Sequence, residues 1–207
     1  MTDSQKTPGS PNRKASLERN TRETQIRITV NLDGSGTFEG ETGLPFFDHM
    51  LNLFARHGRI DLSLWLKGDL DVECHHAVED AGIALGQALV KAAGDKKGIR
   101  RYGESSVPME ESLIRVSLDF CGRPYLYWGL PEMKRAMIGD YATEMTEDFF
   151  RALSNNAGIT MHFECPRGRN AHHLIEAAFK AFARALRESL APDERAPGEI
   201  PSTKGVL

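Results

Sequence analysis

Apolar and polar residues alternate along three short segments of the chain, which predicts strands with one buried face. These segments are 25–32 (QIRITVNL), 60–66 (IDLSLWL) and 113–120 (LIRVSLDF). The turn sequence DGSG follows the first segment, and CGRP follows the third. Each of these turns predicts a further strand after it, and a last strand is predicted at 159–165 (ITMHFEC).

Other segments carry apolar residues at the three- and four-residue spacing of an amphipathic helix. Four helices are predicted, over 46–58, 75–89, 141–158 and 172–186. The first and third of these segments end on a glycine, which is a common helix stop.

The two halves of the chain repeat each other. Aligning HHAVEDAGIALGQAL, from His75, with HHLIEAAFKAFARAL, from His172, gives seven identities in fifteen positions. The preceding segments follow the same order, so a strand, strand, helix, strand, helix unit occurs twice. We predict an α+β fold with this internal duplication, in which two four-stranded sheets have helices packed between them or on one face.

The repeat also predicts the domain boundaries. Residues 1–18 are polar and are predicted to form a disordered N-terminal tail. The first repeat half is predicted at 19–97, and the second, with a C-terminal substrate-binding tail, at 98–207. A charged connector is expected around 92–112.

Composition excludes several classes of protein. The chain has 207 residues, a formal net charge of −3 and no block of Lys or Arg, which argues against a nucleic-acid partner. Its apolar runs are too short to cross a membrane. The polar start lacks the apolar segment of a signal peptide, and three scattered cysteines suit a reducing compartment, so we expect a cytoplasmic protein.

The two HHxxE segments are the main candidates for chemistry. Residues four apart share a helix face, so His75 faces the same way as Glu79, and His172 the same way as Glu176. The second histidines, His76 and His173, point about 100° away.

This geometry predicts two crossed metal sites. One would join His75 and Glu79 with His173. The other would join His172 and Glu176 with His76. Imidazole and carboxylate ligands suit Mn, Fe, Zn or Co, and we favour Mn²⁺ because the pattern offers no thiolates for a structural zinc site.

Other residues are weaker candidates. The repeat suggests His49 as a further ligand and places Asp148 opposite it, whereas His57 and His162 are more often structural. Basic and hydroxyl side chains suited to a phosphate monoester are Arg123, Lys180, Ser202, Thr203 and Lys204. Glu23, just before the first alternating segment, is an acid–base candidate.

Several motifs together resemble the imidazoleglycerol-phosphate dehydratase family, from about Arg19 to Leu207. They are FFDHML, CHHAVEDAGIALGQAL, RYG, SLDFCGRPYL, RGRNAHHLIEAAFKAFARAL and PSTKGVL. The resemblance implies a lyase of histidine biosynthesis that dehydrates D-erythro-imidazole-glycerol 3-phosphate to imidazole-acetol phosphate.

The resemblance also implies cofactors and partners. It implies two Mn²⁺ ions per active site and a homo-oligomer of 24 subunits, with ligand sets that neighbouring chains can share. The implied metal ligands are His49, His75, His76, Glu79, His172, His173 and Glu176. The implied substrate contacts are Glu23, Arg101, Arg123, Lys180, Ser202 and Lys204. Family members often carry His where this chain has Asp148.

Two other functions fit parts of the pattern. A dimetal phosphohydrolase would release phosphate from an ester, although such sites usually hold more Asp and fewer His ligands. A metal-stapled assembly protein would use the HHxxE helices only to join subunits. Basic side chains around an open cavity beside the metals would argue against the second.

Overall fold

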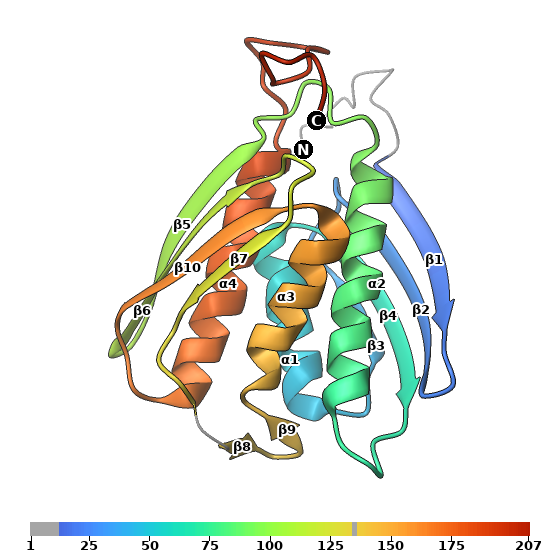
Figure 1. The fold of residues 1–207 in the computed structure, drawn as a ribbon, viewed down its shortest axis with the longest axis vertical. Coiled ribbons are helices and arrows are strands. Elements are labelled where there is room, and N and C mark those ends of the chain that lie inside the picture. The colour runs from blue at the N-terminus through green and yellow to red at the C-terminus, as the bar shows by residue number, and fades with distance from the viewer. Residues whose placement is uncertain (1–12, 134–135) are drawn as a thin grey trace, which may run out of the picture.

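The computed structural model describes residues 13–133 and 136–207. Figure 1 shows two sheets with a layer of helices between them. The first sheet has the order β1-β2-β4-β3 and the second the order β5-β6-β10-β7. The described part of the chain therefore confirms the predicted α+β fold with two four-stranded sheets.

Each half of the chain supplies one sheet and two helices. The first half contains β1 (Lys14–Asn20), β2 (Thr24–Asn31), β3 (Phe38–Glu41), α1 (Pro45–Gly58), β4 (Asp61–Gly68) and α2 (His75–Ala93). The second half contains β5 (Tyr102–Met109), β6 (Ser112–Asp119), β7 (Tyr125–Gly129), α3 (Met145–Ala157), β10 (Thr160–Arg167) and α4 (Ala171–Leu190), with a short hairpin of β8 (Met137–Ile138) and β9 (Tyr141–Ala142) before α3.

The repeat unit has one more strand than the sequence pattern predicts. β1 pairs antiparallel with β2, and β5 pairs antiparallel with β6, each at a sheet edge. The predicted tail of residues 1–18 is therefore wrong from Lys14 onward, and residues 1–12 lie outside the described residues. The connector expected at 92–112 likewise contains an edge strand, β5.

The strands that follow the two turns do not pair with the strands before them. β3 runs parallel to β4, and β7 runs parallel to β10, on the far side of each sheet. The DGSG and CGRP turns thus begin crossover connections and not hairpins. After β3 the helix α1 leads to β4, and after β7 the helix α3 leads to β10, so that each pair of strands is parallel.

Helices of opposite halves pack against each other. α2 lies along α3, and α1 lies along α4 (Figure 1). Glycines allow the first contact, since a Cβ added at Gly82 would stand 2.6 Å from the carbonyl oxygen of Phe149. A single hydrophobic core fills the space between the sheets, so the two halves share one interior.

The two helices that carry the HHxxE motifs, α2 and α4, are called the HH helices below. Both begin at one end of the molecule, the HH end, and finish at the other, near the C-terminus (Figure 1). At that second end Ile99, just after α2, forms a β-bridge with Pro192, just after α4. α2 has 19 residues and α4 has 20, so each spans about 30 Å. No helix in the described part of the chain is long and apolar enough to cross a membrane.

Asp61 fixes the link between β2 and β3. Its Oδ1 accepts hydrogen bonds from the backbone N–H groups of Ser35, Gly36 and Thr37, at 2.8, 3.0 and 3.1 Å, and from the Thr37 hydroxyl at 2.9 Å. Burial alone would raise the pKa of this carboxyl, but the hydrogen bonds outweigh it and hold the pKa at about 2.

We predict that Asp61→Ala lowers the free energy of unfolding by roughly 2 kcal/mol at pH 7, because several donors lose their acceptor. A carboxyl whose folded pKa is depressed stabilises the fold above its unfolded pKa, near 3.8, and this contribution disappears as the pH falls toward 2. Urea unfolding at pH 7 and pH 3 measures both effects. The matched control is Glu39→Ala, which removes an exposed carboxylate from β3; an equal loss for the control would contradict the prediction.

Candidate metal centre

Three predicted ligands meet where α1 lies against α4. The Nε2 atoms of His49 and His172 lie 3.5 and 3.1 Å from the same oxygen of Glu176, Oε2. Ligands that share one ion through bonds of about 2 Å lie up to about 4 Å apart, so both of these pairs can bind a single metal. The donor set of two imidazoles and one carboxylate therefore fits a divalent transition metal.

Local structure sets this group in place. Asn170 caps α4, and its side chain accepts hydrogen bonds from the backbone N–H groups of His172 and His173. The start of α1 is held by Asp48, which accepts from the N–H and hydroxyl of Thr42 at 2.9 and 2.7 Å. Burial raises the pKa of Asp48 above its usual value.

Glu176 is buried, with 7% of its surface exposed. Its second oxygen, Oε1, accepts from Lys180 Nζ at 2.5 Å. Burial would raise the pKa of Glu176, but the Lys180 ammonium and the neighbouring histidines outweigh it and lower the pKa. Glu176 is therefore an anion. One of its oxygens accepts a hydrogen bond from the Lys180 ammonium, and the other is turned toward His49 and His172.

A second group lies at the start of α2. His75 Nε2 stands 3.7 Å from Glu79 Oε2, on the shared face that the spacing predicts. His76 contacts two carboxylates, with Asp69 Oδ2 at 3.0 Å from its Nδ1 and Glu23 Oε1 at 4.0 Å from its Nε2. The acid–base candidate Glu23 is therefore beside the HH pair of α2.

His173 turns to a different partner. Its Nδ1 lies 2.8 Å from Oε2 of Glu111, in the turn between β5 and β6. The hydrogen bond to His173 is the main reason that the pKa of Glu111 falls to about 2. The same bond raises the pKa of His173, and the bond to Asp69 raises that of His76.

The predicted crossed sets do not form within one chain. Among the described residues, groups of three possible ligands close enough to share an ion are His49, His172, Glu176 and, separately, Glu110, Glu111, His173. His49 meets the α4 pair because α1 packs on α4. Neither the set of His75, Glu79 and His173 nor the set of His172, Glu176 and His76 is among these groups, and Asp148 joins neither group.

The predicted phosphate contacts lie at the opposite end of the molecule, Lys180 excepted. Arg101 pairs with Asp119 through Nε and Nη2 at 2.7 and 2.9 Å, and it donates to the carbonyl oxygen of Pro201 at 2.8 Å. Arg123 also approaches Asp119, at 3.8 Å. Arg101 thus holds the C-terminal segment, in which the Lys204 N–H donates to the Ser202 hydroxyl at 3.2 Å.

The separation of the two ends follows from α4. The backbone N–H of Arg101 donates to Ser189 at 2.8 Å, near the end of that helix. Ser189 follows His172 by 17 residues in the helix, which is about 25 Å at 1.5 Å per residue. A small phosphorylated substrate cannot span that distance within one chain.

The two remaining histidines, His57 and His162, belong to neither group of possible ligands among the described residues. His57 lies near Lys180 and Arg184. Burial lowers the pKa of His57, and the positive charges of these two side chains lower it further. His162 is on the outer face of the second sheet, with the rings of Tyr125 and Tyr127 at 5.5 and 5.7 Å.

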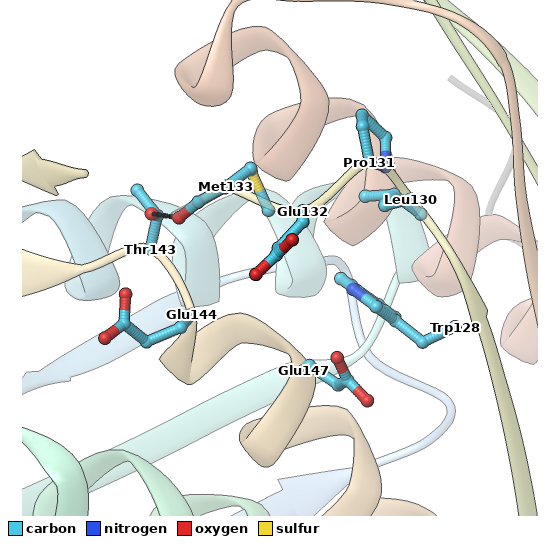
Figure 2. Close-up of a pocket in the computed structure, with 8 residues that line it drawn as sticks. All are labelled: Trp128, Leu130, Pro131, Glu132, Met133, Thr143, Glu144 and Glu147. Atoms are coloured by element: carbon cyan, nitrogen blue, oxygen red, sulfur yellow. Dashed lines mark hydrogen bonds between the residues drawn. The ribbon is translucent and has the colours of Figure 1, made fainter. Parts of the chain in front are cut away.

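A surface pocket elsewhere contains none of the predicted site residues. It lies beside β7 and the start of α3 (Figure 2) and is lined by Trp128, Leu130, Pro131, Glu132, Met133, Thr143, Glu144 and Glu147. The Thr143 hydroxyl donates to the carbonyl oxygen of Met133 at 3.1 Å, which joins two of these lining residues. The candidate site is therefore the histidine clusters and not this pocket.

Sequence reasoning missed three carboxylates that support the site. Asp69 and Glu111 hold the rings of His76 and His173, but they come from loops that no helical spacing connects to those histidines. Asp80, in the second half of the HHAVED motif, is buried and accepts from Arg19 Nη2 at 2.6 Å and from the Thr24 hydroxyl. Asp80 thereby ties α2 to the β1–β2 turn that carries Glu23.

The chain is similar in sequence to proteins of one family. The family model for imidazoleglycerol-phosphate dehydratase matches residues 42–186 of the chain. The imidazoleglycerol-phosphate dehydratase of Moorella thermoacetica is 57% identical over 195 residues, which cover 94% of this chain and 98% of that protein. The corresponding protein of Paraburkholderia phymatum is 56% identical over 195 residues, 94% of this chain and 100% of that protein.

Solved structures agree in fold. The crystal structure of imidazoleglycerol-phosphate dehydratase from Staphylococcus aureus matches with a TM-score of 0.78 and 40% identity, covering 87% of this chain and 99% of that chain. The enzyme from Pyrococcus furiosus, in complex with (S)-C348, matches with a TM-score of 0.78 and 34% identity, covering 92% of this chain and 100% of that chain.

We predict that Asp80→Ala destabilises the protein by roughly 2 kcal/mol, because Arg19 and Thr24 lose a buried acceptor. The effect is smaller than for a fully buried pair, since 29% of the Arg19 side chain is exposed. Thermal or urea unfolding measures it, with Asp71→Ala, which removes an exposed carboxylate from the loop before α2, as the control. Equal stability of the Asp80 variant and wild type would remove Asp80 as the anchor of the Glu23 turn.

Proposed function

The chain belongs to the imidazoleglycerol-phosphate dehydratase family, the hydro-lyases of histidine biosynthesis, and we propose that it dehydrates D-erythro-imidazole-glycerol 3-phosphate with the help of two Mn²⁺ ions. The product is imidazole-acetol phosphate. The observation that carries the metal part of the proposal is the convergence of His49 and His172 on one oxygen of Glu176.

The metals would be held by the two HHxxE helices and by His49. The ligands that we propose are His49, His75, His76, Glu79, His172, His173 and Glu176. When bound, such ions supply Lewis acidity and a fixed orientation for the imidazole ring of the substrate. The chain offers imidazole and carboxylate here, the mixture that supports Mn²⁺ over a thiolate-bound structural zinc.

The reaction needs a general base, because a proton must be removed from a carbon that no carbonyl group acidifies. The hydroxyl leaves from the carbon next to the ring, the neighbouring carbon loses a proton, and the two depart as water. The enol that remains then becomes the ketone. We propose Glu23 for proton transfer, since its carboxylate is exposed and lies 4.0 Å from His76 at the HH end of the chain.

Basic residues would hold the phosphate and so fix the geometry of the reacting carbons. We propose Arg101, Arg123, Lys180, Ser202 and Lys204 for this role. Arg101 already pairs with Asp119, so its part is to place the C-terminal segment and add positive charge beside Arg123.

The distance between the two ends supports a site shared by subunits. His172 and the backbone of Arg101 are separated by about 25 Å along α4. We propose that the HH end of one copy meets the phosphate-binding end of another, and that the crossed ligand sets are also completed between copies. A closed homo-oligomer of 24 subunits would supply this arrangement at every site. The three free cysteines fit the cytoplasmic location that we propose.

The two rival functions make different predictions about product. A dimetal phosphohydrolase would release inorganic phosphate from the substrate. An assembly protein stapled by metal would bind the ions without turning over any substrate.

We predict that removing metal with a chelator abolishes dehydration and that adding Mn²⁺ restores it. The assay follows ketone formation from imidazole-glycerol phosphate and, in parallel, particle size. Mg²⁺ at the same concentration is the control, because it prefers oxygen ligands and should restore less activity. Restored assembly without turnover would favour the assembly protein, and phosphate release would favour the hydrolase.

We predict that Glu23→Gln retains metal and substrate binding but lowers turnover by about 10²- to 10⁴-fold, the usual contribution of a general acid–base group. Glu18→Gln, an exposed carboxylate on the adjacent strand β1, is the matched control. Steady-state kinetics and substrate binding to the metal-loaded protein give the two readouts. Turnover equal to that of wild type would remove Glu23 from the mechanism.

A further inference from the structure

We propose that Glu111 and Asp69 are positioning residues, which set the ring orientation and tautomer of His173 and His76 so that the Nε2 atom of each is free to bind metal. This inference rests on the proposed metal function. It adds to that function two carboxylates from outside the HHxxE motifs.

The two second histidines of the HH pairs have the same arrangement, although their partners come from different places in the fold. His173 Nδ1 lies 2.8 Å from Glu111, in a turn between strands of the second sheet. His76 Nδ1 lies 3.0 Å from Asp69, in the loop before α2. The internal repeat therefore does not account for the likeness.

The chemistry of these bonds fixes the tautomer. An ionised carboxylate only accepts hydrogen bonds, so the proton must be on Nδ1 of each ring. The other nitrogen, Nε2, then carries a lone pair that can bind a metal. Partners of this kind orient a metal-binding imidazole and raise its basicity, and losing one typically costs 10- to 100-fold in metal affinity.

Glu111 holds both the backbone and the ring of His173. Its Oε1 accepts from the backbone N–H of Asn170 and the hydroxyl of Ser112, both at 3.0 Å, while Oε2 faces the ring. Asn170 in turn accepts from the backbone of His173. Backbone and ring of His173 are thus fixed by one connected network.

The two carboxylates differ in a way that gives a sharp test. Oε1 of Glu111 must accept from the Asn170 N–H, so a glutamine at this position keeps its amide oxygen there. Its NH₂ group then faces Nδ1 and forces the His173 proton onto Nε2. The described contacts of the Asp69 carboxylate go to His76, so an asparagine there can rotate and present its oxygen to Nδ1.

The test measures Mn²⁺ affinity and stoichiometry by calorimetry, in protein first stripped with a chelator. We predict that Glu111→Gln and Asp69→Ala weaken binding to the affected sites 10- to 100-fold. Asp69→Asn should stay within about threefold of wild type. Glu110→Gln, which removes the neighbouring exposed charge, should also stay within about threefold. Thermal unfolding without metal identifies a variant that has merely lost stability. If the Glu111 variant fails to fold, the comparison of Asp69→Ala with Asp69→Asn still tests the inference.

Solid-state ¹⁵N NMR of histidine-labelled, metal-free protein gives a readout that a merely structural role would not change. One ring should shift its proton from Nδ1 to Nε2 in Glu111→Gln. Wild-type affinity in Glu111→Gln would overturn the inference, as would equal weakening in Glu110→Gln or Asp69→Asn, since both results would mean that charge alone matters. Failure of the wild-type protein to bind Mn²⁺ would instead overturn the proposed function on which the inference rests.

Discussion

The length of the two HH helices, α2 and α4, sets the distance between the two ends of the molecule. α2 and α4 are rigid elements of 19 and 20 residues, and each begins with its histidine pair at one end of the molecule. Both finish at the other end, where Arg101, Arg123 and the C-terminal segment lie. The proposed metal ligands and the proposed phosphate contacts, Lys180 excepted, are therefore held about 25 Å apart in each chain. A single substrate can use both groups only if two copies meet.

The internal duplication explains how one sequence builds two similar HHxxE helices. Each half supplies a four-stranded sheet, and the helices cross over so that α1 packs on α4 and α2 packs on α3. This exchange moves His49 away from the histidines of its own half and beside His172 and Glu176. Each of these imidazoles lies within 4 Å of a carboxylate, and those of His76, His172 and His173 form hydrogen bonds with one.

Much of this could be predicted from the sequence, because burial on one face leaves a regular pattern. The inner strands β2, β4 and β6 alternate cleanly, and the repeated HHxxE spacing places His172 and Glu176 on one face. The edge strands β1 and β5 were missed because fewer of their residues are buried, so the apolar alternation is weak. The contacts of Glu111 and Asp69 also escaped prediction. The first joins residues 62 positions apart and the second joins a loop to a helix, so both depend on packing and not on helical spacing.

Mixing two inactive variants tests whether each active site joins the HH end of one copy to the phosphate end of another. His172→Asn damages the first end, and Arg123→Ala, in an exposed turn, damages the second. The two chains carry different affinity tags, are dissociated and reassembled with Mn²⁺, and particles that hold both tags are isolated for assay. We expect mixed particles to recover turnover that neither variant has alone. Mixed particles no more active than either parent would contradict it.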